Sequence, residues 1–212
     1  MYAADMKKKL REAKLYLVLD AQVCDYEKLF EILKLAAESD VDVIQLRDKE
    51  GKLEDVLDFC KRALNYLKGK IPFIINDRVE IAYTIGCDGV HLGQEDLSLK
   101  FAREILGDNA IIGVSCQTLE HAIRAEEEGA DYIGFGSVFK TLTKPDRKKM
   151  DLTLLSDVLK KVRIPVFPIG GITPENAGKV VDAGADRIAV TRSLCLAADV
   201  RTATKQFLEI LA

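Results

Sequence analysis

Two aspartates lie at positions where their carboxylates could bind one metal ion together. In the stretch 73–96, Asp77 follows a first apolar strand and Asp96 follows a second, 19 positions later. A strand–helix–strand unit of this length brings two parallel strands to the same edge of a sheet, so both acids should lie on one rim. Carboxylate oxygens are the ligands that hard divalent cations prefer. We therefore predict that Asp77 and Asp96 bind Mg²⁺, with helix capping as the competing interpretation for each acid and for Asn76.

Charged residues follow the apolar run 43–46. Alternation along an extended chain places Gln45, Arg47 and Lys49 on one face. It places Asp48 on the other face. Arginine and lysine side chains together are suited to bind a diphosphate. We count all four residues as candidate binding residues, although a solvated loop would have a similar composition.

The segment 139–144 has the composition of a loop that closes over an anion. It supplies the hydroxyls of Thr141 and Thr143 and the ammonium group of Lys144, with Leu142 between them. Such a loop could act as a lid and an anion clamp, and we count all four residues as candidate binding residues. A mobile loop kept soluble by its lysines is the alternative.

A pair of glycines marks a second anion site. Gly170 and Gly171 directly follow one apolar run, and Thr191 and Arg192 directly follow the next. Bare backbone amides beside a polar strand end are typical of the phosphate sites of barrel enzymes. The sequence therefore predicts two anion sites in one mouth, which suggests a reaction that joins two phosphorylated ligands.

Polar residues also lie within or next to the apolar runs. Ser115 ends the run 111–115 and could donate a hydrogen bond to a ligand oxygen. Cys116 follows it without a partner base in the sequence that would activate it as a nucleophile. His91 lies inside another run, where we favour a hydrogen-bonded core histidine over a ligand contact.

An alternating series of strands and helices must position these residues. We predict strands at 15–19, 43–46, 111–115, 131–134, 165–169 and 187–190, with two more inside 73–96. Each is followed by a segment with helical periodicity, which indicates an α/β protein. Eight such units without interruption favour a single (β/α)8 TIM barrel over residues 1–212, preceded by a short N-terminal extra helix. A doubly wound open sheet is the alternative, but no topological switch point is evident.

Composition narrows the class of protein. The 212 residues carry 31 basic and 34 acidic side chains, and this net charge of −3 gives no reason to expect a nucleic-acid partner. No apolar run could span a membrane, and the charged start lacks the apolar part of a secretory signal, so we expect a cytoplasmic protein. Five cysteines without a CxxC pair indicate neither a disulfide framework nor a zinc site. The oligomeric state stays open, a homo-oligomer included.

Together and in this order, the motifs resemble those of the thiamine phosphate synthase family. The resemblance covers nearly the whole chain and rests on QLRDK at 45–49, NDR at 76–78, DGVHLGQED at 88–96, GVS at 113–115, GFGSVFKTLTK at 134–144 and PIGGI at 168–172. Members of this family join a hydroxymethylpyrimidine diphosphate to a thiazole phosphate and release pyrophosphate. The resemblance implies the same small-molecule substrates and Mg²⁺ here. It also implies a dissociative course, in which pyrophosphate leaves before the thiazole nitrogen attacks.

The resemblance further implies a role for each matching residue. The pyrimidine diphosphate would be held by Gln45, Arg47, Lys49, Asn76, Ser115 and Lys144. Asp77 and Asp96 would bind Mg²⁺. The thiazole phosphate would be held by Thr141, Thr143, Gly171, Thr191 and Arg192. The implied catalytic residues are Arg47, Lys49, Ser115 and Lys144. Arg192 stands where the family often has a serine.

Two other functions stay open. A thiazole tautomerase relative shares the barrel and the phosphate site, but it moves a proton and needs neither Mg²⁺ nor a diphosphate site. A non-catalytic barrel that binds thiazole phosphate as a regulator would bind its ligand without turnover. The presence of the charged set around Arg47 and Lys49, together with Asp77 and Asp96, favours the synthase.

Overall fold

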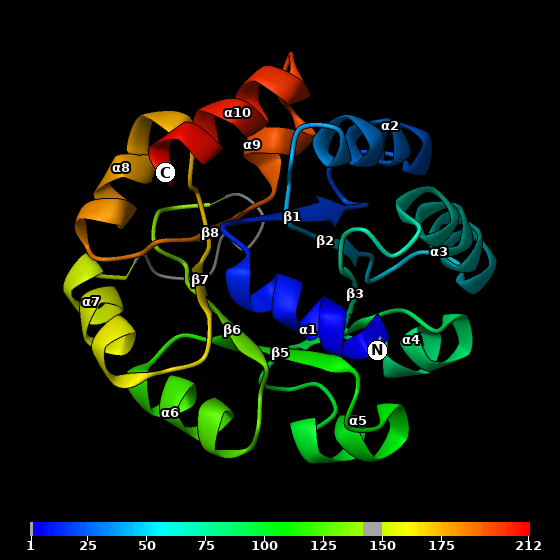
Figure 1. Ribbon diagram of the computed structural model, residues 1–212, viewed down its shortest axis with the longest axis horizontal. Helices are drawn as coiled ribbons and strands as arrows, with labels where there is room; N and C mark the ends of the chain where they lie inside the picture. Colours follow the sequence, from blue (N-terminus) through cyan, green and yellow to red (C-terminus); the bar gives the residue numbers. More distant parts are fainter. Residues whose placement is uncertain (1, 142–149) are drawn as a thin grey trace.

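Eight parallel strands form a barrel surrounded by helices in the computed structural model, which describes residues 2–141 and 150–212 (Figure 1). The strands are β1 (Leu15–Asp20), β2 (Val43–Arg47), β3 (Phe73–Asn76), β4 (Gly89–Leu92), β5 (Ile111–Cys116), β6 (Tyr132–Phe135), β7 (Val166–Pro168) and β8 (Ile188–Val190). They are ordered β7-β6-β5-β4-β3-β2-β1-β8. A bridge between Ile169 and Ala189 joins β7 to β8 and closes the barrel. The predicted (β/α)8 barrel is confirmed, and the open doubly wound sheet is excluded.

The helices follow the strands as the periodicity predicts. They are α1 (Tyr2–Glu12), α2 (Tyr26–Ala37), α3 (Leu53–Leu67), α4 (Val79–Ile85), α5 (Leu99–Leu106), α6 (Leu119–Glu127), α7 (Leu152–Lys161), α8 (Pro174–Asp182), α9 (Arg192–Cys195) and α10 (Val200–Ile210). The short helix α9 was not predicted. Its four residues are too few to show a helical period, and the sequence indicates only a polar end of the strand at Thr191 and Arg192.

The strands are apolar because they are buried on both faces. Every residue of β1, β2, β3 and β4 is buried. Alternate side chains point into the barrel or outward to the helices. Tyr16, Ile74 and Phe167 thus pack in the interior cluster, whereas Leu17 and Ile75 pack in the outer cluster beneath the helices. Inward residues near the carboxyl ends of the strands are therefore free to face a ligand.

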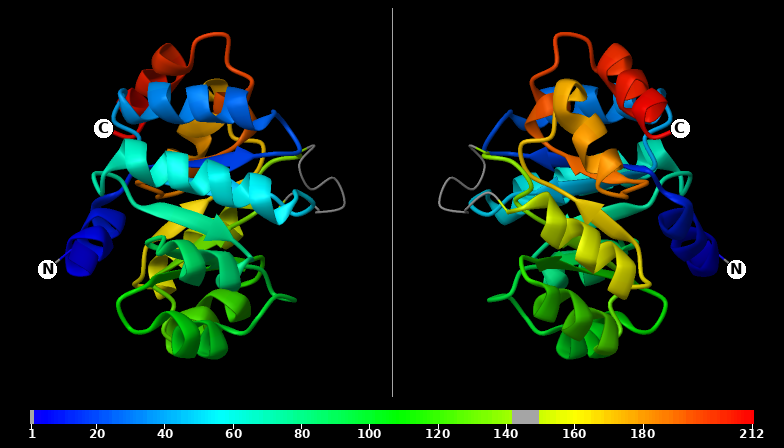
Figure 2. Two further views of the ribbon diagram at one scale, coloured as in Figure 1. Left: turned by 90° about the vertical axis from the view of Figure 1, so that its right-hand side faces the viewer. Right: turned by 90° about the vertical axis from the view of Figure 1, so that its left-hand side faces the viewer.

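Helix α1 covers the end of the barrel where the strands begin (Figures 1 and 2). Its Met6 and Leu10 are each only 1% exposed, and they belong to the interior cluster with Ile74, Ile111 and Tyr132. The helix acts as an apolar plug for that end. The opposite end of the barrel, where the strands finish, is therefore the end left open to ligands by the described residues.

None of the helices in the described ranges is long and apolar enough to cross a lipid bilayer.

Candidate active site

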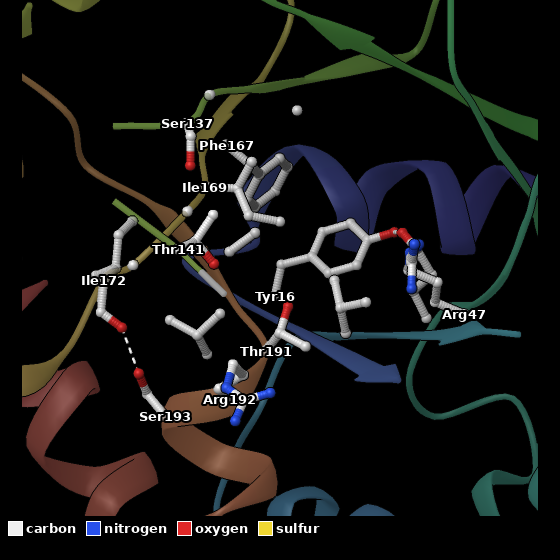
Figure 3. A pocket seen from close by; sticks show the side chains of 18 of the residues that line it. Tyr16, Arg47, Ser137, Thr141, Phe167, Ile169, Ile172, Thr191, Arg192 and Ser193 are labelled. Atoms are coloured by element: carbon white, nitrogen blue, oxygen red, sulfur yellow. Dashed lines mark hydrogen bonds between the residues drawn. The ribbon is translucent and has the colours of Figure 1, made fainter. Parts of the chain in front are cut away.

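A cavity of about 290 Å³ opens at the carboxyl ends of the strands (Figure 3). Every one of the eight strands contributes to its lining, which is the arrangement expected of a barrel's active site. The predicted residues that line it are Gln45, Arg47, Asn76, Ser115, Thr141, Gly170, Gly171, Thr191 and Arg192. Leu142, Thr143 and Lys144 lie outside the described residues. Asp48, Lys49, Asp77 and Asp96 are not among the lining residues, and their places are given below.

Arg47 is held at the cavity wall by a buried acid. Its Nη1 donates to both carboxylate oxygens of Asp20, at 3.0 and 2.9 Å, and to Oε1 of Gln22 at 3.0 Å. Asp20 is fully buried and Arg47 is 7% exposed. The Nε of Arg47 is buried without a hydrogen-bond partner in the described part of the chain. The guanidinium is therefore fixed in direction at the cavity wall.

Sequence reasoning missed Asp20 and Gln22. The sequence does contain a signal for Asp20. This acid ends the apolar run of β1, just as Asp77 comes directly after β3. Strand ends of a closed parallel barrel meet at one rim, so an acid there is a candidate partner for Arg47 on the neighbouring strand. The register pairs Asp20 directly with Arg47.

Asp77, Asp96 and Lys49 form a charged cluster at the rim. Lys49 Nζ lies 3.1 Å from Oδ2 of Asp77. Burial and then the neighbouring carboxyl of Asp96 raise the pKa of Asp77, while Lys49 acts to lower it. The structure thus brings the two predicted metal ligands against each other, as one shared cation requires.

Neither aspartate caps a helix. Helix α4 has Arg78 as its N-cap residue, and helix α5 has Ser98, whose side chain accepts from a backbone N–H. Asp77 adopts a left-handed backbone conformation with φ of 62°, which is uncommon for a residue other than glycine. Asp96 Oδ2 accepts from the backbone N–H of Gly93 at 2.7 Å. The capping interpretation is therefore wrong for both acids and for Asn76.

The two carboxylates fit a divalent cation. They are hard oxygen donors that repel each other unless positive charge lies between them. Among the described residues, no group of three or more His, Cys, Asp or Glu side chains could hold a metal ion. Mg²⁺ suits such a place, because it is commonly bound by one or two carboxylates, with phosphate oxygens and water as its other ligands.

Asp48 is turned toward its own loop, as the alternation predicted. Its carboxylate accepts hydrogen bonds from the hydroxyl of Tyr26 and from the backbone N–H groups of Glu50 and Gly51, the latter two at 3.0 and 2.7 Å. Burial alone would raise the pKa of Asp48, but these hydrogen bonds lower it. The structure places this side chain in support of the loop that carries Lys49.

A continuous chain of hydrogen bonds crosses the cavity floor. We call it the floor chain, and its members in order are Asn76, Gln45, Tyr16, Tyr132, His91 and Ser115. The successive heavy-atom distances are 2.9, 2.8, 2.7, 3.0 and 2.9 Å. Burial raises the pKa of Tyr16 and of Tyr132, so both phenols stay protonated. The interpretation of His91 as a hydrogen-bonded core residue is confirmed, and it lines the cavity as well.

The far side of the cavity is built from the loops after β6, β7 and β8. Gly170 and Gly171 have φ of 109° and 64°. A Cβ on Gly171 would lie 2.4 Å from the carbonyl oxygen of Lys140, so only glycine lets these two loops approach. Ser193 Oγ donates to the carbonyl of Ile172 and ties the loop after β8 to the loop after β7 (Figure 3).

The two cationic sides of the cavity are separate. Figure 3 shows Arg47 and Arg192 on different sides of the Tyr16 side chain. Arg47 belongs to the side that also carries Lys49 and the two aspartates, and Arg192 lies beside Thr191. The floor between the two sides is aromatic. Tyr16 and Phe167 pack edge to face there, with their ring centroids 5.3 Å apart. This geometry suits two anionic groups held on either side of flat rings.

A sequence model of the family described as thiamine monophosphate synthase matches residues 15–194. The chain belongs to this family. The thiamine-phosphate synthase of Clostridium acetobutylicum is 42% identical over 202 residues, which are 93% of this chain and 94% of the relative. That of Methanobrevibacter smithii is 40% identical, over 92% of this chain and 93% of the relative. The solved structure of the thiamine phosphate pyrophosphorylase from Pyrococcus furiosus superposes with a TM-score of 0.85 at 36% identity, covering 97% of this chain and 96% of that one.

Membership of the thiamine monophosphate synthase family confirms the resemblance on which the sequence motifs agreed. It also makes the chain an enzyme of the transferase class. The family match spans every strand of the barrel and ends in α9, so the cavity described above lies wholly within it.

Proposed function

We propose that this enzyme joins 4-amino-2-methyl-5-hydroxymethylpyrimidine diphosphate to 4-methyl-5-(2-phosphoethyl)thiazole, giving thiamine phosphate and pyrophosphate. The C–O bond between the pyrimidine methylene and the diphosphate breaks, and its electron pair leaves with pyrophosphate. The thiazole nitrogen uses its lone pair to form the new C–N bond. The observation that carries the proposal is the pair of cationic sides, Arg47 and Arg192, on one aromatic floor.

The side that carries Arg47 would hold the diphosphate. Arg47 has a guanidinium fixed by Asp20 at the cavity wall, and Lys49 adds an ammonium at the rim. Fixed cations stabilise the negative charge that develops on the leaving pyrophosphate. Mg²⁺ held by Asp77 and Asp96 would neutralise further charge on the same oxygens.

The opposite side would hold the phosphate of the thiazole. Gly170 and Gly171 leave the backbone bare, and Thr191 and Arg192 face the same part of the cavity. A guanidinium binds a phosphate with two hydrogen bonds, which a serine at position 192 would not offer. We infer that Arg192 strengthens the hold on this phosphate.

A dissociative course needs no general base. The nucleophile is a neutral ring nitrogen, so no proton has to be removed before attack. The cavity supplies cations for the leaving group and aromatic faces around the pyrimidine, which are the requirements of a step that makes a carbocation. Positional isotope exchange tests this directly. Pyrimidine diphosphate labelled at the ester oxygen that joins the methylene carbon to phosphorus is incubated without the thiazole. If cleavage and return occur, that label should move to the non-bridging oxygens of the diphosphate.

The reaction itself is tested by mixing both substrates with Mg²⁺ and measuring pyrophosphate. We expect pyrophosphate and thiamine phosphate in equal amounts. A thiazole tautomerase would instead interconvert thiazole isomers without the diphosphate. A regulator would bind thiazole phosphate and release nothing. Either of these results would refute the synthase proposal.

The metal assignment predicts the effect of removing one carboxylate. Asp77→Asn or Asp96→Asn should slow turnover by roughly 10², the scale of losing a key charge-stabilising group. The loss should be partly recovered at high Mg²⁺, because the variants bind the ion more weakly. Turnover is measured over a series of Mg²⁺ concentrations. The control is Asp58→Asn, which changes a carboxylate on the exposed surface of α3. Equal activity of variants and control at limiting Mg²⁺ would refute the assignment.

A further inference from the structure

The floor chain links residues with an expected role to residues that have none. Gln45 and Asn76 at one end and Ser115 at the other are candidate substrate-binding residues. Tyr16, Tyr132 and His91 lie between them. The two tyrosines are at most 2% exposed, and the three residues come from β1, β6 and β4. The chain therefore connects opposite parts of the cavity through the barrel interior.

The chain has one direction, because each tyrosine hydroxyl carries a single proton. Gln45 Nε2 donates to Asn76 Oδ1, so Gln45 Oε1 accepts the proton of Tyr16. Tyr16 must then accept from the hydroxyl of Tyr132, and Tyr132 must accept from Nδ1 of His91. A neutral His91 protonated at Nδ1 accepts at Nε2.

The hydroxyl of Ser115 is the hydrogen-bond partner of His91 Nε2. Its Oγ lies 2.9 Å from His91 Nε2, so its proton is directed to the imidazole. The lone pairs of that oxygen remain for the cavity. At the other end, Asn76 uses its amide oxygen within the chain, which leaves the amide N–H groups for the cavity.

Space for the chain is built into the neighbouring strands. A Cβ on Gly113 would lie 2.0 Å from the ring of Tyr132, and a Cβ on Gly134 would lie 3.1 Å from Cε1 of His91. The ring of Tyr132 also packs against Phe167 and His91, with centroids 5.7 and 5.4 Å apart. Glycines on β5 and β6 and packed rings thus hold the hydroxyls and the imidazole in line.

We propose that Tyr16, Tyr132 and His91 are positioning residues, which hold His91 as the Nδ1-protonated neutral tautomer and so present Ser115 as an acceptor and Asn76 as a donor to the substrate. This pattern complements an aminopyrimidine, which has an amino group that donates and ring nitrogens that accept. The ligand assignment rests on the proposed function. The tautomer of His91 does not, because it follows from the ligand-free chain.

The first test reads the tautomer. The chain has only two histidines, His91 and His121, so ring nitrogens labelled with ¹⁵N give a simple spectrum, and His121→Gln assigns it. We expect the proton on Nδ1 of His91. In Tyr132→Phe no hydroxyl accepts from Nδ1, so the proton should move to Nε2 and bond to Ser115. A proton on Nε2 in the wild type, or an unchanged tautomer in the variant, would overturn the proposal.

The second test measures recognition of the pyrimidine. Tyr132→Phe should raise the KM for the pyrimidine diphosphate by about tenfold, the scale of one misdirected hydrogen bond, and leave the KM for the thiazole phosphate unchanged. Tyr66→Phe is the matched control. It removes a phenol that bonds to Glu38 at 2.8 Å on the protein surface, and it should change neither KM. An equal rise in both KM values would indicate a general loss of structure and contradict the proposal.

Binding of the free aminopyrimidine separates this proposal from the proposed function. Calorimetric titration with 4-amino-2-methyl-5-hydroxymethylpyrimidine needs no turnover. If the wild type releases no pyrophosphate but Tyr132→Phe weakens this binding about tenfold, the reaction assignment fails and the positioning role stands. If turnover is normal and the variant binds the aminopyrimidine as tightly as the wild type, the positioning role fails alone.

Discussion

Single residues at this site serve the fold and the ligand at once, and Arg47 is the clearest case. It lines the cavity and also completes a buried ion pair with Asp20. Removing one partner of a buried pair leaves the other charge without compensation. The guanidinium would then be free to turn away from the place where a diphosphate would lie.

We expect Asp20→Asn to lower the free energy of unfolding by about 3–5 kcal/mol, the cost of stranding a buried charge. The variant should also raise the KM for the diphosphate, because Arg47 loses its fixed direction. Urea denaturation and steady-state kinetics measure the two effects. Glu27→Gln is the control, since it breaks an exposed pair with Arg62 and should change stability little. A loss in Asp20→Asn no larger than in the control would contradict the ion-pair argument.

Asp48 gives a prediction that depends on pH. Hydrogen bonds from Tyr26 and the loop backbone hold its folded-state pKa below the ordinary value of 3.8. The stability it contributes is therefore present above pH 3.8 and is lost as the pH falls through the lowered pKa of the folded state. Asp48→Asn should destabilise the protein at pH 7, and the difference from wild type should shrink below pH 3.8. Urea midpoints at pH 7, 4 and 3 measure this, and a difference independent of pH would refute it.

Whether a site residue could be predicted from the sequence depends on its place relative to the strands. Charged and polar groups at the end of a strand or just after it, such as Arg47 and Asp77, could be found because strand ends meet at one rim of a barrel. Tyr16 and Tyr132 could not, because a tyrosine inside an apolar run has the composition of ordinary core. Their hydroxyls meet across the barrel, and that meeting depends on strand register, which sequence periods do not fix.

At the scale of elements, the strands fit together because glycines stand where large rings from neighbouring strands need room. Gly113 of β5 lies beside Tyr132 of β6, and their register pairs them directly. The number and order of strands could be predicted from the alternating apolar runs. The short helix α9 could not, nor could the glycine contacts, since both arise from packing between distant segments.

Gly113→Ala should destabilise the protein by about 1–3 kcal/mol, the usual cost of overpacking a core. Gly178→Ala is the matched control, because it lies in α8 with open space around the new methyl group. That control should stabilise the protein by about 0.5–1 kcal/mol through higher helix propensity. Thermal or urea unfolding compares the two. Opposite signs are expected, and a neutral Gly113→Ala would show that Tyr132 can move aside.

At the scale of the whole molecule, the barrel has two ends with different tasks. The end plugged by α1 is apolar and closed, and the other carries the cavity. Substitutions in the plug should therefore act on stability, and substitutions at the mouth on substrate binding and turnover.

Leu10→Ala tests this division. The side chain is 1% exposed in the interior cluster, so its loss should lower the free energy of unfolding by about 2–5 kcal/mol. Both KM values should stay as in the wild type at temperatures where the variant is folded. Urea denaturation and kinetics at the same temperature measure this. A changed KM without a change in stability would show that the two ends are coupled.

The barrel is closed between β7 and β8 by the bridge from Ile169 to Ala189, and both strands have only three residues. Gly171 and Thr191 lie just beyond these strands, on the two edges of that seam. A phosphate bound by both residues would hold the barrel closed at the place where its two shortest strands meet. Resistance to heat should then rise with the concentration of the thiazole phosphate, because a ligand that binds only the closed form adds to its stability by mass action.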